Sequence, residues 1–184
     1  MPTQHPLSQP PVPEVRTPRL LLRGHKLEDF DAFAAMQGDP AVMRYITGQP
    51  LSRDQAWQKF SRSPGHWHLR GFGYWIACDA ETGQFLGELG FSDFERDLEP
   101  SLRGCLEAGW LLQRSAHGRG LATEAVSAAI TWAGEHFPDR SIVCMISDDN
   151  APSLRVAEKC GFAPWTTSRY HGEVVNLYRW ASDT

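Results

Sequence analysis

The residues best suited to bind a ligand lie in a short glycine-containing turn between an apolar stretch and a helical pattern. Glycine lets the backbone approach a ligand closely and adopt positive φ. A helix N-terminus adds unpaired N–H groups and partial positive charge. This combination predicts a phosphate-binding turn, and a plain strand-to-helix connection is the alternative. The turn contains Arg114, His117, Gly118, Arg119 and Gly120.

Two better-known phosphate loops do not fit this turn. No Lys-Ser or Lys-Thr pair follows Gly120, which excludes a P-loop. A third glycine is also missing, and no acidic residue stands at the right distance after a following strand, which excludes a dinucleotide fingerprint. The turn therefore predicts phosphate binding without identifying the nucleotide.

A second polar cluster follows the apolar segment 141–146. Asn150 and Ser153 open a short helical pattern that Gly161 ends. Ligands of open α/β sheets bind beyond the C-terminal ends of parallel strands, and the glycine turn also follows its strand. If the two strands are neighbours, both clusters face one crevice. A structural role is equally open, because Asn150 is a good N-cap.

The elements that must position these clusters follow from hydrophobic periodicity. An apolar stripe from Leu121 to Ala133 predicts a long helix that Pro138 stops. The continuously apolar segment 141–146 predicts a strand covered on both faces. Together with a strand at 105–112, they form a βαβ unit, so the two strands are expected to be parallel with a right-handed crossover.

The rest of the chain predicts shorter elements around this unit. Further strands are predicted at 19–23, 73–79, 84–91, 162–170 and 174–180, and further helices at 26–36, 40–45, 53–60 and 151–160. The segment 63–75 reads as irregular and aromatic. Its aromatic residues fit either a core around a loop or the wall of an acceptor pocket, and His66 and His68 have no acidic partner nearby in sequence to suggest a metal.

Composition limits the class of protein. The chain has 184 residues and a formal charge of −4, which fits one domain and argues against a nucleic-acid or membrane-surface binder. No apolar run could span a bilayer, and no secretory signal is expected. The four cysteines have no metal-ligand spacing, so we expect reduced cysteines, no metal and a cytoplasmic protein. Residues 1–14 are expected to be a disordered lead-in, and 15–184 the single domain.

The two polar clusters together resemble the GNAT acetyltransferase superfamily. Ser115-Ala-His-Gly-Arg-Gly120 is similar to its acetyl-CoA pyrophosphate loop. Asn150-x-x-Ser153, followed by Lys159-x-Gly-Phe162, resembles the RimJ/RimL-like branch, which acetylates ribosomal-protein N-termini. The segments 17–23 and 106–112 also resemble that branch, and the likeness covers roughly residues 15–180.

The resemblance implies a fold, a cofactor and a set of contacts. The fold would be a single α+β or α/β domain, with a mixed, mostly antiparallel sheet of about seven strands, helices on both faces and a central parallel pair. The cofactor would be acetyl-CoA as co-substrate, with a main-chain N–H near Trp110 or Leu111 polarising the thioester. Its contacts would be Trp110, Leu111, Leu112, Arg114, His117, Gly118, Arg119, Gly120, Leu121, Ala122, Thr123, Asn150 and Ser153.

Two positions depart from the family pattern. Ser115 stands where Gln or Arg is usual, with little expected loss because the loop binds through main-chain N–H groups. Ala157 stands where many members carry a tyrosine that protonates the thiolate. The resemblance then points to Ser153 as the group that protonates or hydrogen-bonds the leaving sulfur.

Acyl transfer to an amine also needs a base, because the amine must be neutral to attack. Alternation places Glu107 on one face of its strand with Gly109 and Leu111, so we expect Glu107 to take the proton directly or through water. Pairing with a basic neighbour is an equal alternative for Glu107. Glu88 and Asp93 are weaker candidates.

The acceptor is the least determined part of the sequence-based interpretation. A protein or peptide N-terminal amine is the leading expectation, and a small amine such as an amino acid, polyamine or antibiotic is the alternative. A non-catalytic acetyl-CoA binder must also be considered. A homodimer through the last strand is an option that the composition does not require.

Overall fold

The computed structural model describes residues 11–181. The predicted lead-in 1–14 falls mostly outside this range. Within it, the main-chain carbonyl of Pro13 accepts a hydrogen bond of 2.8 Å from the indole of Trp75. The boundaries at 14 and 15 stay predictions.

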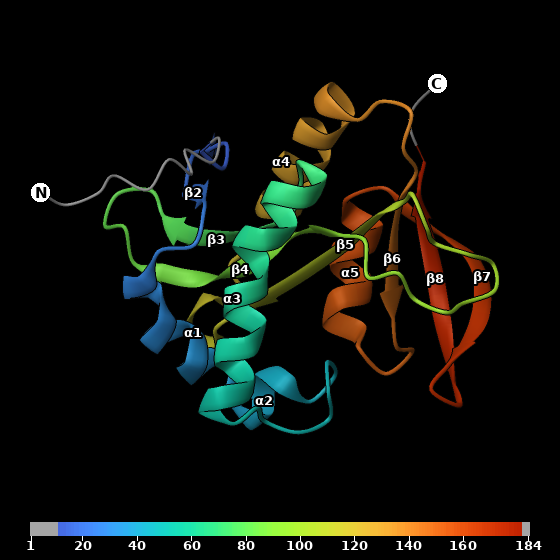
Figure 1. Cartoon of the computed structure of the whole chain (residues 1–184), viewed down its shortest axis with the longest axis horizontal. Helices are drawn as coiled ribbons and strands as arrows, with labels where there is room; N and C mark the ends of the chain where they lie inside the picture. Colours follow the sequence, from blue (N-terminus) through green and yellow to red (C-terminus); the bar gives the residue numbers. More distant parts are fainter. Residues whose placement is uncertain (1–10, 182–184) are drawn as a thin grey trace, which may run out of the picture.

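A single eight-stranded sheet forms the centre of the described fold, in the order β1-β2-β3-β4-β5-β6-β8-β7 (Figure 1). The strands are β1 (Val15–Arg16), β2 (Leu20–Arg23), β3 (Tyr74–Asp79), β4 (Phe85–Ser92), β5 (Leu106–Leu112), β6 (Ile142–Ile146), β7 (Phe162–Tyr170) and β8 (Glu173–Trp180). Only β5 and β6 are parallel neighbours. The predicted mixed, mostly antiparallel sheet with a central parallel pair is confirmed, and the two-residue β1 is the strand that the patterns did not predict.

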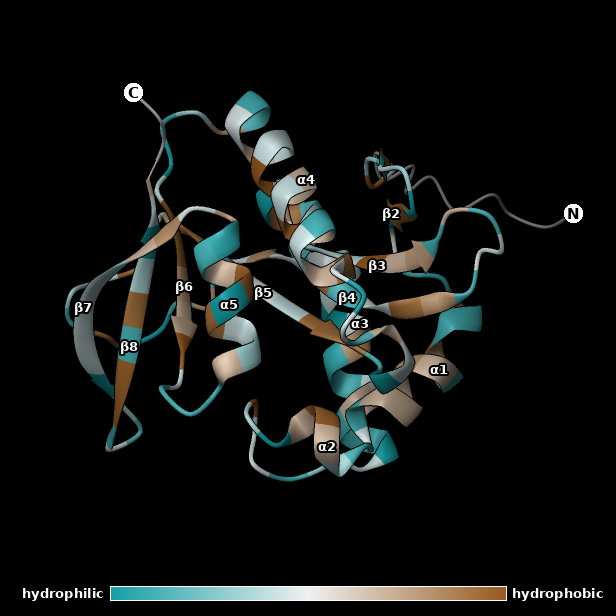
Figure 2. Cartoon of the chain, turned by 180° about the vertical axis from the view of Figure 1, so that it is seen from behind, coloured by the Kyte–Doolittle hydropathy of each residue, from teal (hydrophilic) through white to brown (hydrophobic). Residues whose placement is uncertain are grey.

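Helices cover both faces of the sheet, as predicted. On one face lie η1 (Leu27–Asp29), α1 (Phe30–Gln37), α2 (Pro40–Met43) and the first part of α3 (Arg53–Arg70), whose Trp67 packs in the core of the other face. On the other lie α4 (Leu121–His136) and α5 (Ala151–Lys159). Figure 1 shows α3 in front of the strands, and Figure 2, from behind, shows α4 and α5 in front of them. Strands β3 and β6 are largely brown, and therefore hydrophobic, in Figure 2, and most of their residues are buried.

The apolar stripe of α4 explains why this helix lies close to the sheet. Leu121, Ala125, Ala129 and Ala133 recur at four-residue intervals and are all at most 2% exposed. Residues four apart lie on one helix face, and alanine side chains let the helix axis approach the strands. The helix ends at His136, before Pro138, as the sequence predicts.

Helix α3 is longer than the predicted segment 53–60. Ser52 caps it through a reciprocal capping box with Gln55. The helix then continues through Pro64 to Arg70, so the prediction of an irregular segment from 63 onward is wrong for 63–70. Burial of Trp67 against the indoles of Trp75 and Trp132, with ring centroids 4.8 and 5.6 Å away, stabilises this last part. Tertiary packing therefore outweighs the cost of a proline inside the helix.

Candidate active site

The parallel strands β5 and β6 are paired only where they begin. Leu106 is in register with Ile142 and Glu107 with Val143. Beyond these positions β5 stays paired with β4, while β6 stays paired with β8. Figure 2 shows the two strands diverging toward their C-terminal ends. The main-chain groups of β5 on that side thus have no ladder partner in β6 after Glu107 and can bind a ligand.

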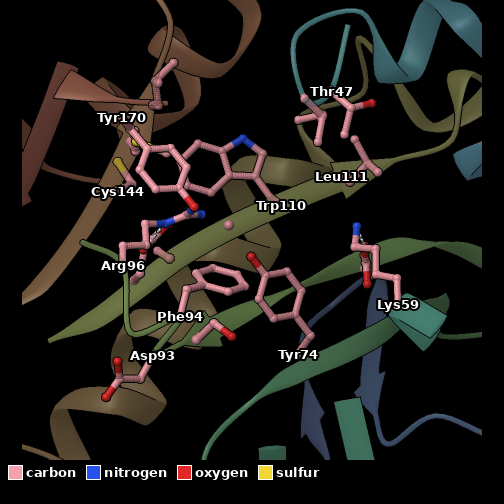
Figure 3. Close-up of a pocket in the computed structure, with 18 of the residues that line it drawn as sticks. Thr47, Lys59, Tyr74, Asp93, Phe94, Arg96, Trp110, Leu111, Cys144 and Tyr170 are labelled. Carbon is pink, nitrogen blue, oxygen red and sulfur yellow. Dashed lines mark hydrogen bonds and ion pairs between the residues drawn. The ribbon is translucent and has the colours of Figure 1, made fainter. Parts of the chain in front are cut away.

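A cavity of about 1080 Å³ lies beside this divergence, large enough for a cofactor arm and an acceptor together. Figure 3 shows Tyr74, Phe94, Arg96, Trp110 and Tyr170 around it. Among the predicted site residues, the lining includes Glu107, Trp110, Leu111, Asn150 and Ser153. The other predicted contacts do not line it: they are Leu112 at the end of β5 and Arg114, His117, Gly118, Arg119, Gly120, Leu121, Ala122 and Thr123 in the turn and the first turn of α4.

The turn before α4 has the geometry of an anion site. Gly118 and Gly120 adopt φ of 72° and 74°, which side-chain-bearing residues rarely adopt. Gly120 is the N-cap of α4, and no side chain caps the helix there. The first N–H groups of α4 are therefore free for a ligand. His117 is committed to the scaffold, because its Nε2 donates to the carbonyl of Leu112 at 2.7 Å.

A segment from the start of the chain supports this turn. Glu124, in the first turn of α4, accepts hydrogen bonds from Thr17 Oγ1 at 2.5 Å and Arg19 Nε at 2.6 Å. Arg19 Nη1 also donates to the carbonyl of Arg119 at 2.9 Å. Burial alone would raise the pKa of Glu124, but these hydrogen bonds outweigh it and lower the pKa. Arg19 thus joins a carboxylate of α4 to the glycine turn itself.

The start of α5 lines the cavity through Asn150 and Ser153. Asn150 caps the helix, with its Oδ1 accepting from the N–H of Ser153 at 3.2 Å. Cys160 ends α5, and Gly161 follows with φ of 85°, as predicted. Within the described chain, the side-chain amide nitrogen of Asn150 and the hydroxyl of Ser153 form no hydrogen bond with protein, so capping leaves both groups available to a ligand.

Glu107 is held by an arginine from the β4–β5 loop. Arg96 Nε lies 2.9 and 3.1 Å from the two carboxylate oxygens, and Arg96 Nη2 lies 3.0 Å from Oε1. The rings of Phe94 and Tyr170 flank the guanidinium, with centroids 4.5 and 4.8 Å away. This is the pairing with a basic neighbour that the sequence left as the alternative. The assignment of Glu107 as base stays a prediction.

The two weaker candidates are also paired. Glu88 is 1% exposed, and its Oε1 accepts from Lys59 Nζ at 2.5 Å and from Gln37 Nε2 at 3.0 Å. Asp93 lies 3.5 Å from Arg70. No protein group in the described chain bonds to Oε2 of Glu88, which lines the cavity. Each buried carboxylate of the cavity therefore has its own cation.

Aromatic residues of the segment 63–75 fill both of the roles that the sequence allowed, the core and the cavity wall. Trp67, Phe72 and Trp75 are core residues. His66 and Tyr74 line the cavity. His66 is nevertheless structural: its Nδ1 donates to the carbonyl of Phe72 at 2.8 Å, and its Nε2 accepts from the N–H of Asp93 at 3.1 Å. These partners require the neutral ring.

Several site residues carry no sequence signal. Arg96, Lys59 and Tyr170 come from three segments far apart in the chain and meet only at the cavity. No spacing rule joins them to Glu107 or Glu88. The one sequence indication of the acceptor side was the aromatic segment 63–75, for which a pocket wall was one of two alternatives.

Among residues 11–181, no three or more His, Cys, Asp or Glu side chains gather as a metal site. Within the same range, no helix is both long and apolar enough to cross a bilayer.

A sheet that opens between two parallel strands, with a glycine turn at a helix N-terminus beside it, defines an acyl-CoA-dependent transferase. The sequence profile of the acetyltransferase (GNAT) domain matches residues 19–163. The chain therefore belongs to the GNAT acetyltransferase family, and it is an enzyme that transfers an acetyl group from acetyl-CoA to an amine.

Several individual proteins are similar to this chain over most of its length. The uncharacterized protein YkkB of Bacillus subtilis is 29% identical over 170 residues, covering 88% of this chain and 92% of its own. An acetyltransferase from Agrobacterium tumefaciens has a TM-score of 0.81 at 30% identity, covering 93% of this chain and 95% of its own. A Salmonella typhimurium acetyltransferase that modifies the N-terminal serine of ribosomal protein L7/L12 shares the fold, with a TM-score of 0.74 at 18% identity over 93% of this chain and 100% of its own.

Proposed function

We propose that this enzyme acetylates the α-amino group of a protein or peptide. The observation that carries the proposal is the charge balance of the cavity, in which the buried carboxylates Glu88, Asp93 and Glu107 are paired with Lys59, Arg70 and Arg96. A polyamine needs unpaired carboxylates to bind its several charges. An acceptor with a single amine does not need such unpaired carboxylates.

The acidity of the amine supports the same acceptor. An α-amino group has a pKa of about 7.7–8.0, whereas a lysine side chain has one of about 10.4. A site whose carboxylates already bond to cations has few free oxygen lone pairs for the amine proton, so it suits an amine that is partly neutral at physiological pH. The N-terminal serine substrate named for the Salmonella relative belongs to this class.

In this proposal acetyl-CoA lies between β5 and β6. Its pyrophosphate binds the main-chain N–H groups from Gly118 to Thr123, with charge from Arg114 and Arg119. The pantetheine arm runs along the unpaired side of β5, from Leu112 to Trp110, and meets the amide of Asn150. Near Trp110 or Leu111 a main-chain N–H polarises the thioester carbonyl. The hydroxyl of Ser153 hydrogen-bonds the departing sulfur.

Small amines form the second candidate class. An amino acid or antibiotic would enter the same cavity, and the exposed Arg62 on its lining could bind an acidic group of such a molecule. The same chemistry would follow with a different acceptor.

A thiol-release screen tests the proposal. Acetyl-CoA is combined with a hexapeptide whose only amine is a free N-terminal serine. In the control peptide the N-terminus is acetylated and one residue is replaced by lysine, so that the only amine is the lysine side chain. Amino acids, spermidine and an aminoglycoside complete the panel. We expect turnover of the first peptide alone. Turnover of a small amine instead would reassign the acceptor, and acetyl-CoA binding without thiol release for any amine would indicate a non-catalytic binder.

A further inference from the structure

A row of three residues across the sheet brings a tyrosine hydroxyl into the cavity. Tyr74 on β3 is in register with Gly90 on β4, and Gly90 is in register with Gly109 on β5. Because neither glycine has a side chain, the ring of Tyr74 can lie across both strands. A Cβ built on Gly109 would overlap the hydroxyl oxygen of Tyr74. Figure 3 shows this hydroxyl directed toward β5.

The hydroxyl of Tyr74 has no protein partner in the described chain. The main-chain carbonyl of Tyr74 accepts a hydrogen bond from Trp67 Nε1 at 2.9 Å, but no side-chain or main-chain group bonds to the phenol oxygen. Buried hydroxyl groups normally find a partner. A phenol that faces a cavity with both its donor and its acceptor capacity unused is suited to bind a ligand there.

The charges around this hydroxyl indicate what kind of ligand it meets. Glu107, Gly109 and Leu111 share one face of β5, and Leu111 is in register with Glu88 on β4. The hydroxyl over Gly109 therefore lies between two carboxylates. Burial, reinforced by the negative charges of Glu88 and Glu107, raises the pKa of Tyr74. The phenol thus stays neutral, and its surroundings favour an N–H donor over an anion.

The position of the hydroxyl matches the reacting amine. Gly109 precedes Trp110 and Leu111, where the thioester lies in the proposed function. We propose that the Tyr74 hydroxyl oxygen accepts a hydrogen bond from the acceptor amine and holds its nitrogen over β5, facing the thioester carbon. This inference rests on the proposed function. It makes Tyr74 a residue that touches the attacking group, and Gly109 the position that leaves room for it.

Replacement of Tyr74 by phenylalanine tests the inference, since it removes only the hydroxyl. With the amine that the wild type acetylates best in the panel above, we expect Tyr74→Phe to lower kcat/KM about 10- to 100-fold. Affinity for acetyl-CoA, measured by calorimetry, and the melting temperature should stay unchanged. Tyr178→Phe is the matched control, because Tyr178 lies on β8 outside the cavity lining, and it should retain full activity.

Gly109→Ala provides an independent variant. The new methyl group overlaps the hydroxyl position of Tyr74, so the hydroxyl must move, and the loss of kcat/KM should resemble that of Tyr74→Phe. The double variant should be no worse than either single variant, since both remove one contact. Additive losses would show that the two residues act separately.

The outcomes separate this inference from the proposed function. Full activity of Tyr74→Phe overturns the inference and leaves the transferase intact. A parallel loss of acetyl-CoA affinity or of thermal stability in Tyr74→Phe also overturns it, because Tyr74 would then be structural. If the wild type binds acetyl-CoA and releases no thiol with any amine, the proposed function fails, and the inference fails with it.

Discussion

The contact between Arg96 and Glu107 bears directly on the prediction that Glu107 is the base. Both oxygens of Glu107 lie 2.9–3.1 Å from the guanidinium. Glu88 also lines the cavity, and its two hydrogen-bond partners both bond to Oε1, so Oε2 has no protein partner in the described chain. A base must present a free lone pair to the amine or to a bridging water. Glu88 is therefore the main alternative to Glu107 as the base.

Two isosteric variants distinguish these carboxylates. If Glu107 is the base, Glu107→Gln lowers kcat/KM for the amine by about 10²–10⁴-fold at neutral pH, and the loss shrinks as rising pH deprotonates the amine. Glu88→Gln is the matched comparison. If Glu88 alone shows this profile, the base is Glu88. Full turnover in both variants would exclude direct carboxylate catalysis by either residue.

At the scale of elements, the N-terminal segment fastens the cofactor turn. Arg19 neutralises Glu124, a carboxylate located where an anionic diphosphate should bind. Arg19→Ala should weaken acetyl-CoA binding by about threefold to tenfold at low salt, because Glu124 then repels the ligand. Adding Glu124→Gln should restore much of the affinity.

Calorimetric affinity at low and high salt checks this prediction. Arg53→Ala removes a comparable exposed arginine, paired with Asp31 on the opposite face, and should leave affinity unchanged. If the double variant binds no better than Arg19→Ala, the arginine supports the loop by its contacts alone and not by neutralising charge.

Local signals explain which elements the sequence could predict. The cap at Asn150, the Gly161 stop and the apolar stripe of α4 are properties of short segments, and the structure reproduces them. The predicted helix 53–60 stops short of the observed α3, which continues through Pro64 to Arg70. There, burial of Trp67 among other indoles outweighed the proline, and such burial is visible only in three dimensions.

At the scale of the whole molecule, the site depends on contacts between distant segments. The βαβ unit could be predicted because its period and order are local. The partners of Glu107 and Glu88, and the row from Tyr74 to Gly109, depend on strand register across the sheet. A single sequence does not specify that register. This is why the cofactor side of the site was predictable in outline and the acceptor side was not.

The central claim also concerns the whole molecule: acetyl-CoA binds where β5 and β6 diverge, with its diphosphate at the start of α4. After Glu107, β5 has no partner in β6, and the first N–H groups of α4, after Gly120 with φ of 74°, have no side-chain cap. A β-branched residue is strained in this conformation and would disrupt the turn without touching the core.

Calorimetric titration of acetyl-CoA into the wild type and Gly120→Val tests this claim most directly. We predict saturable heat for the wild type and, for the variant, an affinity lower by about 100-fold or more, with an unchanged circular dichroism spectrum. Absence of heat with the wild type, or equal affinity in Gly120→Val, would contradict the account.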